Sequence, residues 1–322
     1  MNKKLCAVLA RPPTRIVWRS VHPRRPQASC RCLPGEIERV QVSPSMSLYR
    51  PKGDGLSTDF IYREVYEGEN CYLRHGIEIR DGDLVVDVGA NVGIASLYFA
   101  ERVGASGAVI SFEPTELVFR SLEENVRARG LKHVVYPQNL AIGSQAGEGE
   151  ITVYRAASGW NTLRPNSQSV IHDVGAFASN GGNVLFPGAR FIPRAVKAAL
   201  GKLSAFYLTR GAKTMPCKVE TLSRAIHFAN SPLLDRKRDI ALLKIDVERA
   251  ECQVLFGIEE EDWARIKQVV AEVHAESLRT FVATLQSQSF QFVHTEQSKE
   301  LEGSDLYNVF AIRQEAKKQR VS

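Results

Sequence analysis

Short apolar runs followed by helical patterns recur through the middle of the chain and predict an open α/β sheet. Leu84–Val88 is an apolar run bounded by a polar turn, and apolar residues at helical spacing follow Asn91. Ala108–Phe112 is a second such run, and a helical pattern covers residues 115–129, where Gly130 predicts its end. Strands that alternate with helices in this way are typical of a parallel sheet.

The second half of the chain continues this pattern and ends on two strands. Further strands are predicted at four places, residues 134–136, 150–155, 240–245 and 268–273, and the first of them continues irregularly to residue 143. Residues 250–256 predict a helix that ends at Gly257. The last two apolar runs, residues 290–293 and 306–312, are expected to form an antiparallel pair that closes the sheet.

Two segments interrupt this regular organisation. Residues 36–57 hold prolines and end in Gly-Asp-Gly, which predicts a linker with at most one edge strand. Residues 156–216 form an insertion whose later part places Ile192, Val196 and Leu203 on one helical face. A long insertion of this kind favours a lid over the binding site, and a solvated basic surface helix is the alternative.

Polar residues and glycines gather where the predicted strands end. Gly89 and Gly93 follow the first strand and remove side chains where backbone must approach closely. Glu113 ends the second strand 24 residues after Gly89, near the roughly 20-residue offset at which an acid reaches a nucleotide ribose. Asn91 stands where a dinucleotide-binding turn needs its second glycine, so a tight turn without a ligand is the alternative.

Taken in order, these motifs resemble the FkbM-type S-adenosylmethionine-dependent methyltransferases. They are Asp-Val-Gly-Ala-Asn-Val-Gly at 87–93, Phe-Glu-Pro at 112–114, Asn-Val at 125–126, Leu-Ala-Ile-Gly at 140–143 and Lys-Ile-Asp-Val-Glu-Arg-Ala-Glu at 244–251. The resemblance covers residues 58–315 and implies a Rossmann-like, seven-stranded, mostly parallel sheet with helices on both faces. It also implies O-methyl transfer to hydroxyls of sugars, lipids and natural products. Two positions depart from the family: Arg249 replaces its usual glycine, and Ser223 replaces a frequent aspartate.

The resemblance places the cofactor at the carboxyl edge of the sheet. The positions it implies for cofactor binding are Asp87, Gly89, Asn91, Gly93, Glu113 and Ala141. An ionised carboxylate only accepts hydrogen bonds and has two oxygens, so Glu113 is expected to hold both ribose hydroxyls. Asp87 would support the turn or bind the methionine end of the cofactor, and Asn91 would either cap the first helix or contact the cofactor.

Candidate catalytic groups follow the later strands. Asp246 is expected to act as a base or to accept a hydrogen bond from the hydroxyl of the methyl acceptor. Its alternative role is to cap the next helix. His274 titrates near neutrality and is a second candidate base, with a structural role as the alternative. Glu248 is a further catalytic candidate or a favourable charge at a helix start. Trp160, Asn161 and Arg249 are expected to contact the acceptor.

No metal is expected, because the chain has no Cys or His cluster at ligand spacing. The net charge of +6 divides unevenly: residues 1–35 carry +8, residues 151–216 carry +7, and the rest carries −9. This acidic core argues against a nucleic-acid partner. The basic insertion predicts an anionic small-molecule or carrier-bound acceptor, or an anionic membrane face.

The two ends of the chain and its cysteines give indications of the cellular compartment of the protein. The first 35 residues lack acids and periodicity, which predicts disorder, with an organelle transit peptide or an upstream start codon as explanations. Residues 316–322 form a second tail. The six cysteines show no paired spacing, and no apolar run approaches the roughly 20 residues that span a bilayer. We therefore expect a cytoplasmic protein without a transmembrane segment.

Two other functions share parts of this pattern. An NAD(P)-dependent oxidoreductase would use the same strand, turn and ribose acid, but it would need a glycine in place of Asn91. A non-catalytic binding protein with the same fold is the second alternative, and Arg249 is its motivation.

Overall fold

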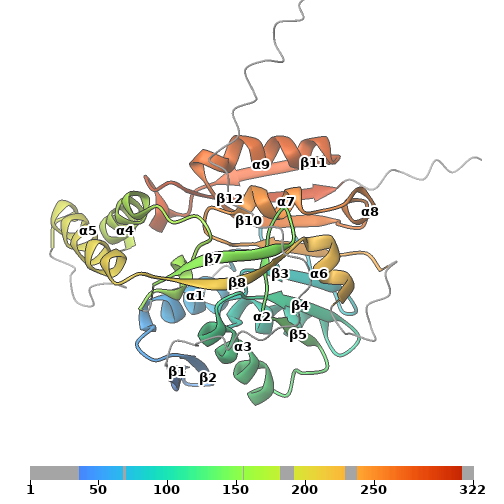
Figure 1. Cartoon of the computed structure of the whole chain (residues 1–322), viewed down its shortest axis with the longest axis horizontal. Helices are drawn as coiled ribbons and strands as arrows, with labels where there is room; N and C mark the ends of the chain where they lie inside the picture. The colour runs from blue at the N-terminus through green and yellow to red at the C-terminus, as the bar shows by residue number, and fades with distance from the viewer. Residues whose placement is uncertain (1–35, 68–69, 155, 182–191, 229–237, 314–322) are drawn as a thin grey trace, which may run out of the picture.

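The computed structural model describes residues 36–67, 70–154, 156–181, 192–228 and 238–313 (Figure 1). Its centre is a seven-stranded sheet with the order β11-β12-β10-β9-β3-β4-β5. The strands, in chain order, are β3 (Leu84–Val88), β4 (Ala108–Phe112), β5 (Val135–Gln138), β9 (Leu242–Ile245), β10 (Gln268–His274), β11 (Phe290–Glu296) and β12 (Leu306–Arg313). Only β12 runs antiparallel to its neighbours, so the expected mostly parallel α/β sheet is confirmed.

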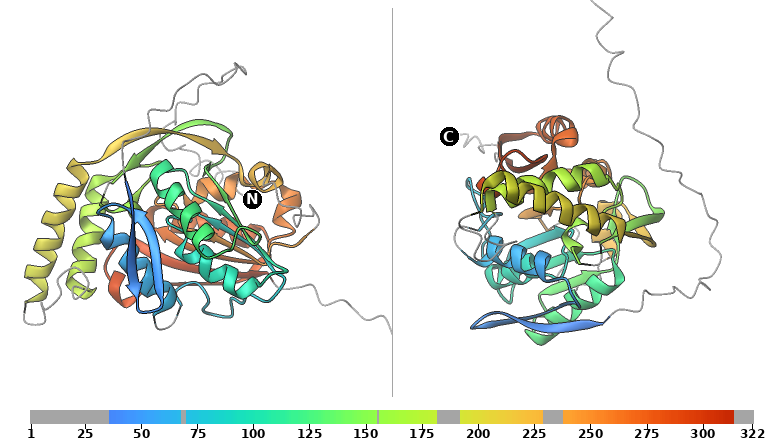
Figure 2. Two further views of the ribbon diagram at one scale, coloured as in Figure 1. Left: turned by 90° about the horizontal axis from the view of Figure 1, so that it is seen from below. Right: turned by 90° about the vertical axis from the view of Figure 1, so that its left-hand side faces the viewer.

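Both faces of this sheet are covered, which explains why its strands are continuous apolar runs. Helices α1 (Gly55–Tyr66), α2 (Ile94–Val103) and α3 (Glu116–Ala128) pack on one face. Helices α6 (Leu222–Phe228), α7 (Glu251–Phe256), α8 (Glu260–Trp263) and α9 (Ala275–Ser287) pack on the other (Figure 2). In β3, Val85 faces the first layer while Val86 and Val88 face the second. This doubly covered sheet fixes the edge at which the polar strand ends meet.

The segment before the sheet is more ordered than the sequence predicts. Residues 37–51 form an antiparallel hairpin of β1 (Ile37–Ser43) and β2 (Met46–Pro51), and α1 begins at Gly55, so the expected linker over residues 36–57 is wrong. Met46 and Leu48 are buried against the core. The prolines that suggested a linker lie at the turn and at the end of the hairpin, where a missing N–H is tolerated. The predicted tails lie outside the described residues.

The insertion and the residues that flank it form two structures. Strands β6 (Ala141–Ile142), β7 (Gly147–Val153) and β8 (Lys213–Glu220) make a second small sheet in the order β6-β8-β7. Between β7 and β8, helices α4 (Ser167–Gly181) and α5 (Arg194–Arg210) project from the side of the molecule (Figures 1 and 2). The helix expected in the later part of the insertion is confirmed as α5, although Ile192, which was placed on its apolar face, lies before the helix begins. Neither α4 nor the pairing of β7 with β8 was predicted.

Asn125 joins the N-terminal hairpin to the core and generates the first prediction. Its amide exchanges hydrogen bonds of 2.6 and 2.8 Å with the backbone of Tyr49 and donates to the Val92 carbonyl at 2.8 Å. Asn125→Ala should lower the free energy of unfolding in urea by about 2–4 kcal/mol, since three buried hydrogen bonds are lost. Glu124→Ala, which removes only an ion pair of the neighbouring residue near the surface, is the control and should cost under about 1 kcal/mol. Equal losses in both variants would contradict this role of Asn125.

Candidate functional site

The turn after β3 is shaped by close contact with the strand beside it. Gly89 has a φ of +81°, and a Cβ there would lie 1.8 Å from the carbonyl oxygen of Asp246. Any side chain is therefore excluded at Gly89, with or without a ligand. Gly93 has a φ of +90°, and a Cβ there would lie 2.4 Å from Leu122 on α3. Both glycines are required for packing, and only Gly89 also lines a pocket.

A buried ammonium connects the two central strand ends. Lys244 on β9 donates to the Gly89 carbonyl at 2.8 Å, and its Nζ lies 3.0 Å from Asp87 Oδ1 and 3.5 Å from Asp246 Oδ2. Burial alone would lower the pKa of Lys244, but the two carboxylates raise it overall. Sequence reasoning missed this role, although a lysine inside an otherwise apolar strand was the available signal.

Asp87 is buried beside Lys244 and accepts a 2.6 Å hydrogen bond from Ser96 on α2. It does not line either pocket, so the structure places it where it supports the turn. Asn91 does line a pocket and adopts a φ of +52°, with its side chain donating to Ser158 at 3.0 Å. The N-cap of α2 is Gly93 and not Asn91, so Asn91 does not cap that helix.

The first pocket lies along the carboxyl edge of β3 and β4. Its empty space, including the part open to solvent, is about 600 Å³. The predicted cofactor positions in its lining are Gly89, Asn91, Glu113 and Ala141. Apolar side chains, including Leu140, Ile142 and Ile151, form the rest of a wall suited to a flat aromatic base.

Glu113 is the one buried carboxylate of this first pocket. Its Oε1 accepts from the Thr115 N–H at 2.8 Å and its Oε2 from the Asn91 N–H at 3.2 Å. Burial raises the pKa of Glu113 to about 7, against the opposing effect of these hydrogen bonds. A carboxylate held in this way at the end of β4 fits the ribose hydroxyls of a nucleoside cofactor.

A second pocket of about 920 Å³ adjoins the first. The two share Ile61, Gly159, Asp246 and Glu248 in their linings. The walls of the second pocket are mainly apolar and come from α1, α4 and the loop before α4: Leu56, Phe60, Ile61, Trp160, Val174 and Phe177. Trp160 thus faces the second pocket, whereas Asn161 lines the first.

Three carboxylates meet where the pockets join. One oxygen each of Asp246, Glu248 and Glu272 lies within 4.8 Å of the others. Burial raises the pKa of Glu248 to about 8, and burial also raises the pKa of Glu272 well above its usual value. Tyr72, which sequence reasoning missed, donates to Asp246 Oδ2 at 3.3 Å. Such oxygen atoms could hold a divalent cation, and independence from metal stays a prediction.

His274 lies behind Glu248 and lines neither pocket. It is 2% exposed, its Nδ1 is 2.7 Å from Glu251 Oε1, and its Nε2 is 3.4 Å from Glu248 Oε2. Burial alone would lower the pKa of His274, but its hydrogen bond to Glu251 and the charge of Glu248 raise it overall. The structure therefore places His274 where it can act on an acceptor only through Glu248.

Arg249 does not line either pocket but holds α4 in place. It is 4% exposed, donates to Ser169 on α4, and lies 3.5 Å from Asp173 on α4 and 3.3 Å from Glu276 on α9. Its φ of +72° explains the glycine that the resemblance leads one to expect at this position. Arg249 therefore adopts a backbone conformation that favours glycine, and its side chain forms an ion pair that holds the insertion in place.

The loop before α4 is fixed from the opposite side. Ser158 donates to the buried carboxylate of Asp54, and the Asp54 Oδ1 accepts from the Ser158 N–H at 3.1 Å. Burial raises the pKa of Asp54 to about 6. Since Ser158 also accepts from Asn91, this contact links the N-terminal segment, the insertion and the cofactor turn. From the sequence, Asp54 is expected only in the Gly-Asp-Gly turn that ends the predicted linker.

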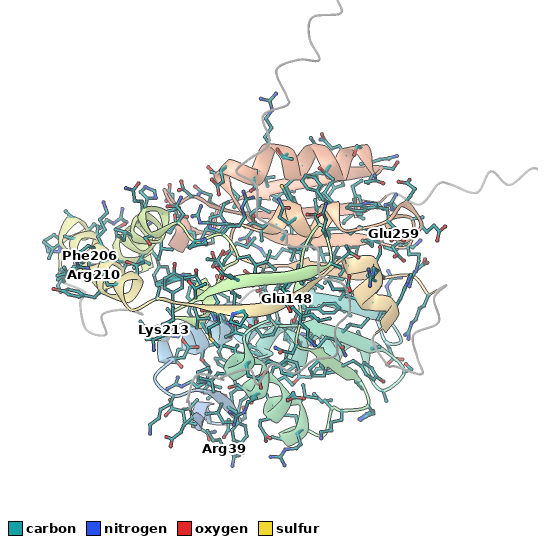
Figure 3. All side chains as sticks on the ribbon, in the orientation of Figure 1. Arg39, Glu148, Phe206, Arg210, Lys213 and Glu259 are labelled. Atoms are coloured by element: carbon teal, nitrogen blue, oxygen red, sulfur yellow. The ribbon has the colours of Figure 1, made fainter. Side chains whose placement is uncertain are left out.

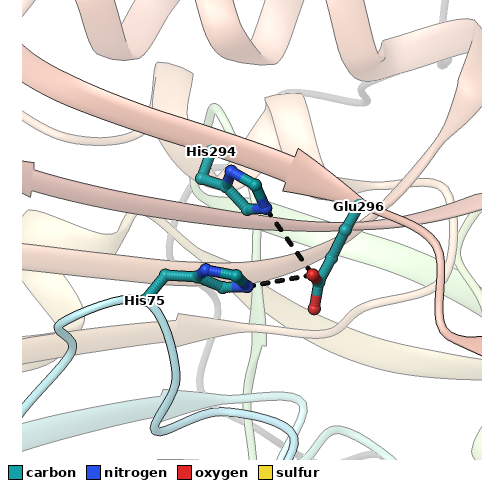
Figure 4. Close-up of side chains that lie close together, drawn as sticks. All are labelled: His75, His294 and Glu296. Atoms are coloured by element: carbon teal, nitrogen blue, oxygen red, sulfur yellow. Dashed lines mark hydrogen bonds and ion pairs between the residues drawn. The ribbon is translucent and has the colours of Figure 1, made fainter.

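A separate cluster lies on the edge strand β11 (Figure 4). His75 Nε2 lies 2.9 Å from Glu296 Oε2, His294 Nε2 lies 3.5 Å from the same oxygen, and Arg74 pairs with Glu296 Oε1 at 2.7 Å. None of these residues lines the two pockets. The cluster attaches the loop before β3 to β11.

The basic residues that the structure describes in the insertion do not line the pockets. Arg194, Lys197 and Lys202 lie on α5, outside both linings. Among the described residues, every charged side chain that lines the second pocket is acidic: Glu64, Asp173, Asp246, Glu248 and Glu272. The expected anionic acceptor therefore finds no cationic partner in this lining.

Comparison with known proteins agrees with this geometry. The profile of the Methyltransferase FkbM domain matches residues 87–298. The chain is 33% identical over 259 residues to the 31-O-demethyl-FK506 methyltransferase FkbM of Streptomyces tacrolimicus, covering 79% of this chain and 89% of that protein. It is 26% identical to Methyltransferase sdnD of Sordaria araneosa, over 67% of this chain and 75% of that one.

Among solved structures, a SAM-dependent O-methyltransferase from Thermotoga maritima aligns with a TM-score of 0.37 at 13% identity. This alignment covers 76% of this chain and 63% of that one. Fibrillarin from Aeropyrum pernix with bound S-adenosyl-L-methionine aligns with a TM-score of 0.38 at 12% identity, over 88% and 85% of the two chains.

Arg249→Gly should loosen α4 without opening the cofactor pocket. The variant relieves the positive φ but breaks a buried ion pair, and the second effect is the larger. We expect amide exchange in α4 to accelerate at least tenfold while exchange in β3 and α2 stays unchanged. Arg249→Lys, which keeps the charge but not the planar fork, should give an intermediate result. Unchanged protection of α4 in the glycine variant would show that Arg249 is not its anchor.

Proposed function

The chain belongs to the FkbM methyltransferase family, whose cofactor is S-adenosylmethionine, and we propose that it methylates a hydroxyl of a small or carrier-bound acceptor. The observation that carries this proposal is the meeting of two pockets at Asp246 and Glu248. One pocket has the buried carboxylate that suits a nucleoside, and the other is open for an acceptor. Reaction between two bound molecules requires such a shared boundary, because positioning supplies much of the rate enhancement.

The cofactor fits the first pocket by the chemistry of its donors and acceptors. Glu113 would accept from the ribose hydroxyls, and the apolar wall around Leu140 and Ile142 would cover the base. When bound, S-adenosylmethionine supplies an electrophilic methyl group on a cationic sulfur. The carboxylates of Asp246 and Glu248 would attract that cation toward the boundary of the pockets.

The transfer of methyl to a hydroxyl requires that the hydroxyl proton be removed, and Glu248 suits this role. A pKa of about 8 lies near neutrality, and a general base is most effective when its pKa is near the pH of the reaction. His274 and Glu251 would position Glu248 from behind and share the proton it receives. Asp246, which accepts from Tyr72, would orient the acceptor hydroxyl.

The acceptor is proposed to present apolar surface to the second pocket. Trp160, Val174 and Phe177 give that pocket a wide apolar wall, and its acids lie at the end that meets the first pocket. The S. tacrolimicus relative carries the name 31-O-demethyl-FK506 methyltransferase, and the missing O-methyl group in that name supports a hydroxyl acceptor. Arg249 lies outside both pockets, so the feature that motivated a non-catalytic alternative does not block the site.

The cofactor site is tested by Glu113→Ala. Loss of its hydrogen bonds should weaken S-adenosylmethionine binding by about 1.5–3 kcal/mol, or roughly 10- to 150-fold, in calorimetry. Because the ribose hydroxyls donate to the ionised form, affinity of the parent should fall as the pH drops below about 7. Glu113→Gln should lack this fall, and Glu123→Ala on the exposed side of α3 should bind as the parent does. A folded Glu113→Ala variant with undiminished affinity would refute the assignment.

Methyl transfer itself is tested with tritiated S-adenosylmethionine against pooled sugars, lipids and carrier-bound thioesters. With an acceptor in hand, turnover should rise with pH through about 8, because Glu248 must be ionised to take the proton. Glu248→Gln should lower turnover strongly, abolish this rise and leave cofactor affinity nearly unchanged. His274→Ala should move the midpoint upward, since the imidazolium charge lowers the pKa of Glu248. A normal rate and pH profile for Glu248→Gln would place the base elsewhere.

A further inference from the structure

Helix α5 presents small residues to its neighbour and large apolar residues to the outside. Gly201 lies so close to α4 that a Cβ would come within 2.5 Å of the Ala178 Cβ, and Ala205 is fully buried. These small residues let the two helices approach closely. The side of α5 that faces α4 is therefore already buried by contacts between the two helices.

The opposite side carries the outer face of α5, which we define as Val196, Leu200, Leu203, Phe206 and Tyr207. Four of these residues follow the spacing i, i+4, i+7 and i+11 and so align along the helix. Leu203 is 51% and Tyr207 is 65% exposed. Among the described residues eight large apolar side chains are exposed, and five of them form this face. Such a concentration marks an interaction surface.

Charge identifies the kind of partner. Helix α5 carries Arg194, Lys197, Lys202 and Arg210 and no acidic residue, and Lys213 follows it. Arg210 lies 4.8 Å from the ring centre of Phe206, so a cation borders the apolar face directly. Figure 3 shows Phe206 and Arg210 at the free edge of the helical hairpin, beyond the body of the protein.

We propose that the outer face of α5 docks on a lipid bilayer that contains anionic lipids. Large exposed apolar side chains that are bordered by Lys and Arg can insert at the headgroup boundary, while the cations attract anionic headgroups. Among the described residues no helix is both long and apolar enough to cross the membrane, so docking would be from the surface. The projecting position of the hairpin leaves this face accessible to a flat partner (Figure 2).

Other occupants agree less well with the charges. A second copy of the chain docked face to face would bring two sets of cations together. The chain's own ends are also basic, since residues 1–35 carry eight cations and no acid and residues 314–322 carry three cations and one acid. Like charges at a contact oppose association. An anionic lipid surface is the partner that satisfies both the apolar residues and the cations.

Docking has a consequence for the acceptor, which, unlike the docking itself, rests on the proposed function. Val174 and Phe177 on α4 line the second pocket, while α5 covers the other side of α4. Packed helices lie about 8–10 Å apart. The docked protein would thus hold its acceptor pocket two helix layers from the lipid, near acceptors carried in the membrane.

The test is co-sedimentation of the full chain with vesicles of phosphatidylcholine alone and of phosphatidylcholine with phosphatidylglycerol in equal parts. The parent should bind the anionic vesicles, and raising the salt to about 1 M should weaken binding. Reversing two charges, Lys197→Glu with Arg210→Glu, should reduce partitioning at least about tenfold. Leu203→Ser with Tyr207→Ser should reduce it comparably. Phe256→Ser, which removes an exposed aromatic residue from α7, is the matched control and should bind as the parent does.

Melting temperature and S-adenosylmethionine affinity, measured on every variant, show that the protein stays folded and keep this result separate from methyl transfer. If the serine variant unfolds, the charge-reversal variant alone decides. The proposal is overturned if the parent binds neither vesicle, or if it binds both equally and regardless of the α5 charges. It is also overturned if light scattering shows a dimer that the α5 variants dissociate, because the occupant is then a second copy.

Discussion

The site depends on one buried cation, the ammonium of Lys244. Taking a charge out of water is tolerated only when opposite charges and hydrogen bonds surround it, and here Asp87, Asp246 and the Gly89 carbonyl supply them. These three groups come from β3, from its turn and from the end of β9. The requirement to satisfy Lys244 therefore fixes the relative position of the two strand ends between which the cofactor would lie. The same requirement explains why Asp87 is fully buried although it contacts no pocket.

A second constraint joins the insertion to this centre. The backbone at Glu248 and Arg249 is left-handed at both residues, which directs one side chain into the pockets and the other toward α4. Thr162, in the loop before α4, donates to the Glu248 carbonyl and holds this unusual turn from the insertion side. Strain of this kind persists only where surrounding contacts over-determine it. The position of Glu248 and the position of α4 are thus set by the same short segment.

The strands and the cofactor turn could be predicted because their signals are local. Apolar runs such as Ala108–Phe112 and the offset from Gly89 to Glu113 depend on neighbouring residues, and the structure places both at the expected edge. The contacts of Tyr72 and Asp54 could not be predicted, because each joins residues more than 100 positions apart. Helix α4 is rich in Ser, Gly and Ala, but Val170, Val174 and Phe177 follow helical spacing in it, so a signal for this helix was available; close packing with α5 stabilises it. The sequence predicts that Arg249 contacts the acceptor, because Asp173 is far from it in the chain. Only the structure shows that Asp173 lies close enough to Arg249 to form an ion pair.

The uneven charge of the chain reflects the separation of its acidic residues, which line the second pocket, from the basic residues of the helical hairpin, which face solvent. The acids that line the second pocket face inward from α1, α4, β10 and the segment after β9, while the cations of α5 face solvent. Asp173, the one acid of the insertion between residues 156 and 216, lies on the inner side of α4 beside Arg249. Charge therefore changes sign across a hairpin two helices thick. This arrangement would favour a cationic cofactor on the inner side of that hairpin and, in the docking that we propose, an anionic surface on its outer side.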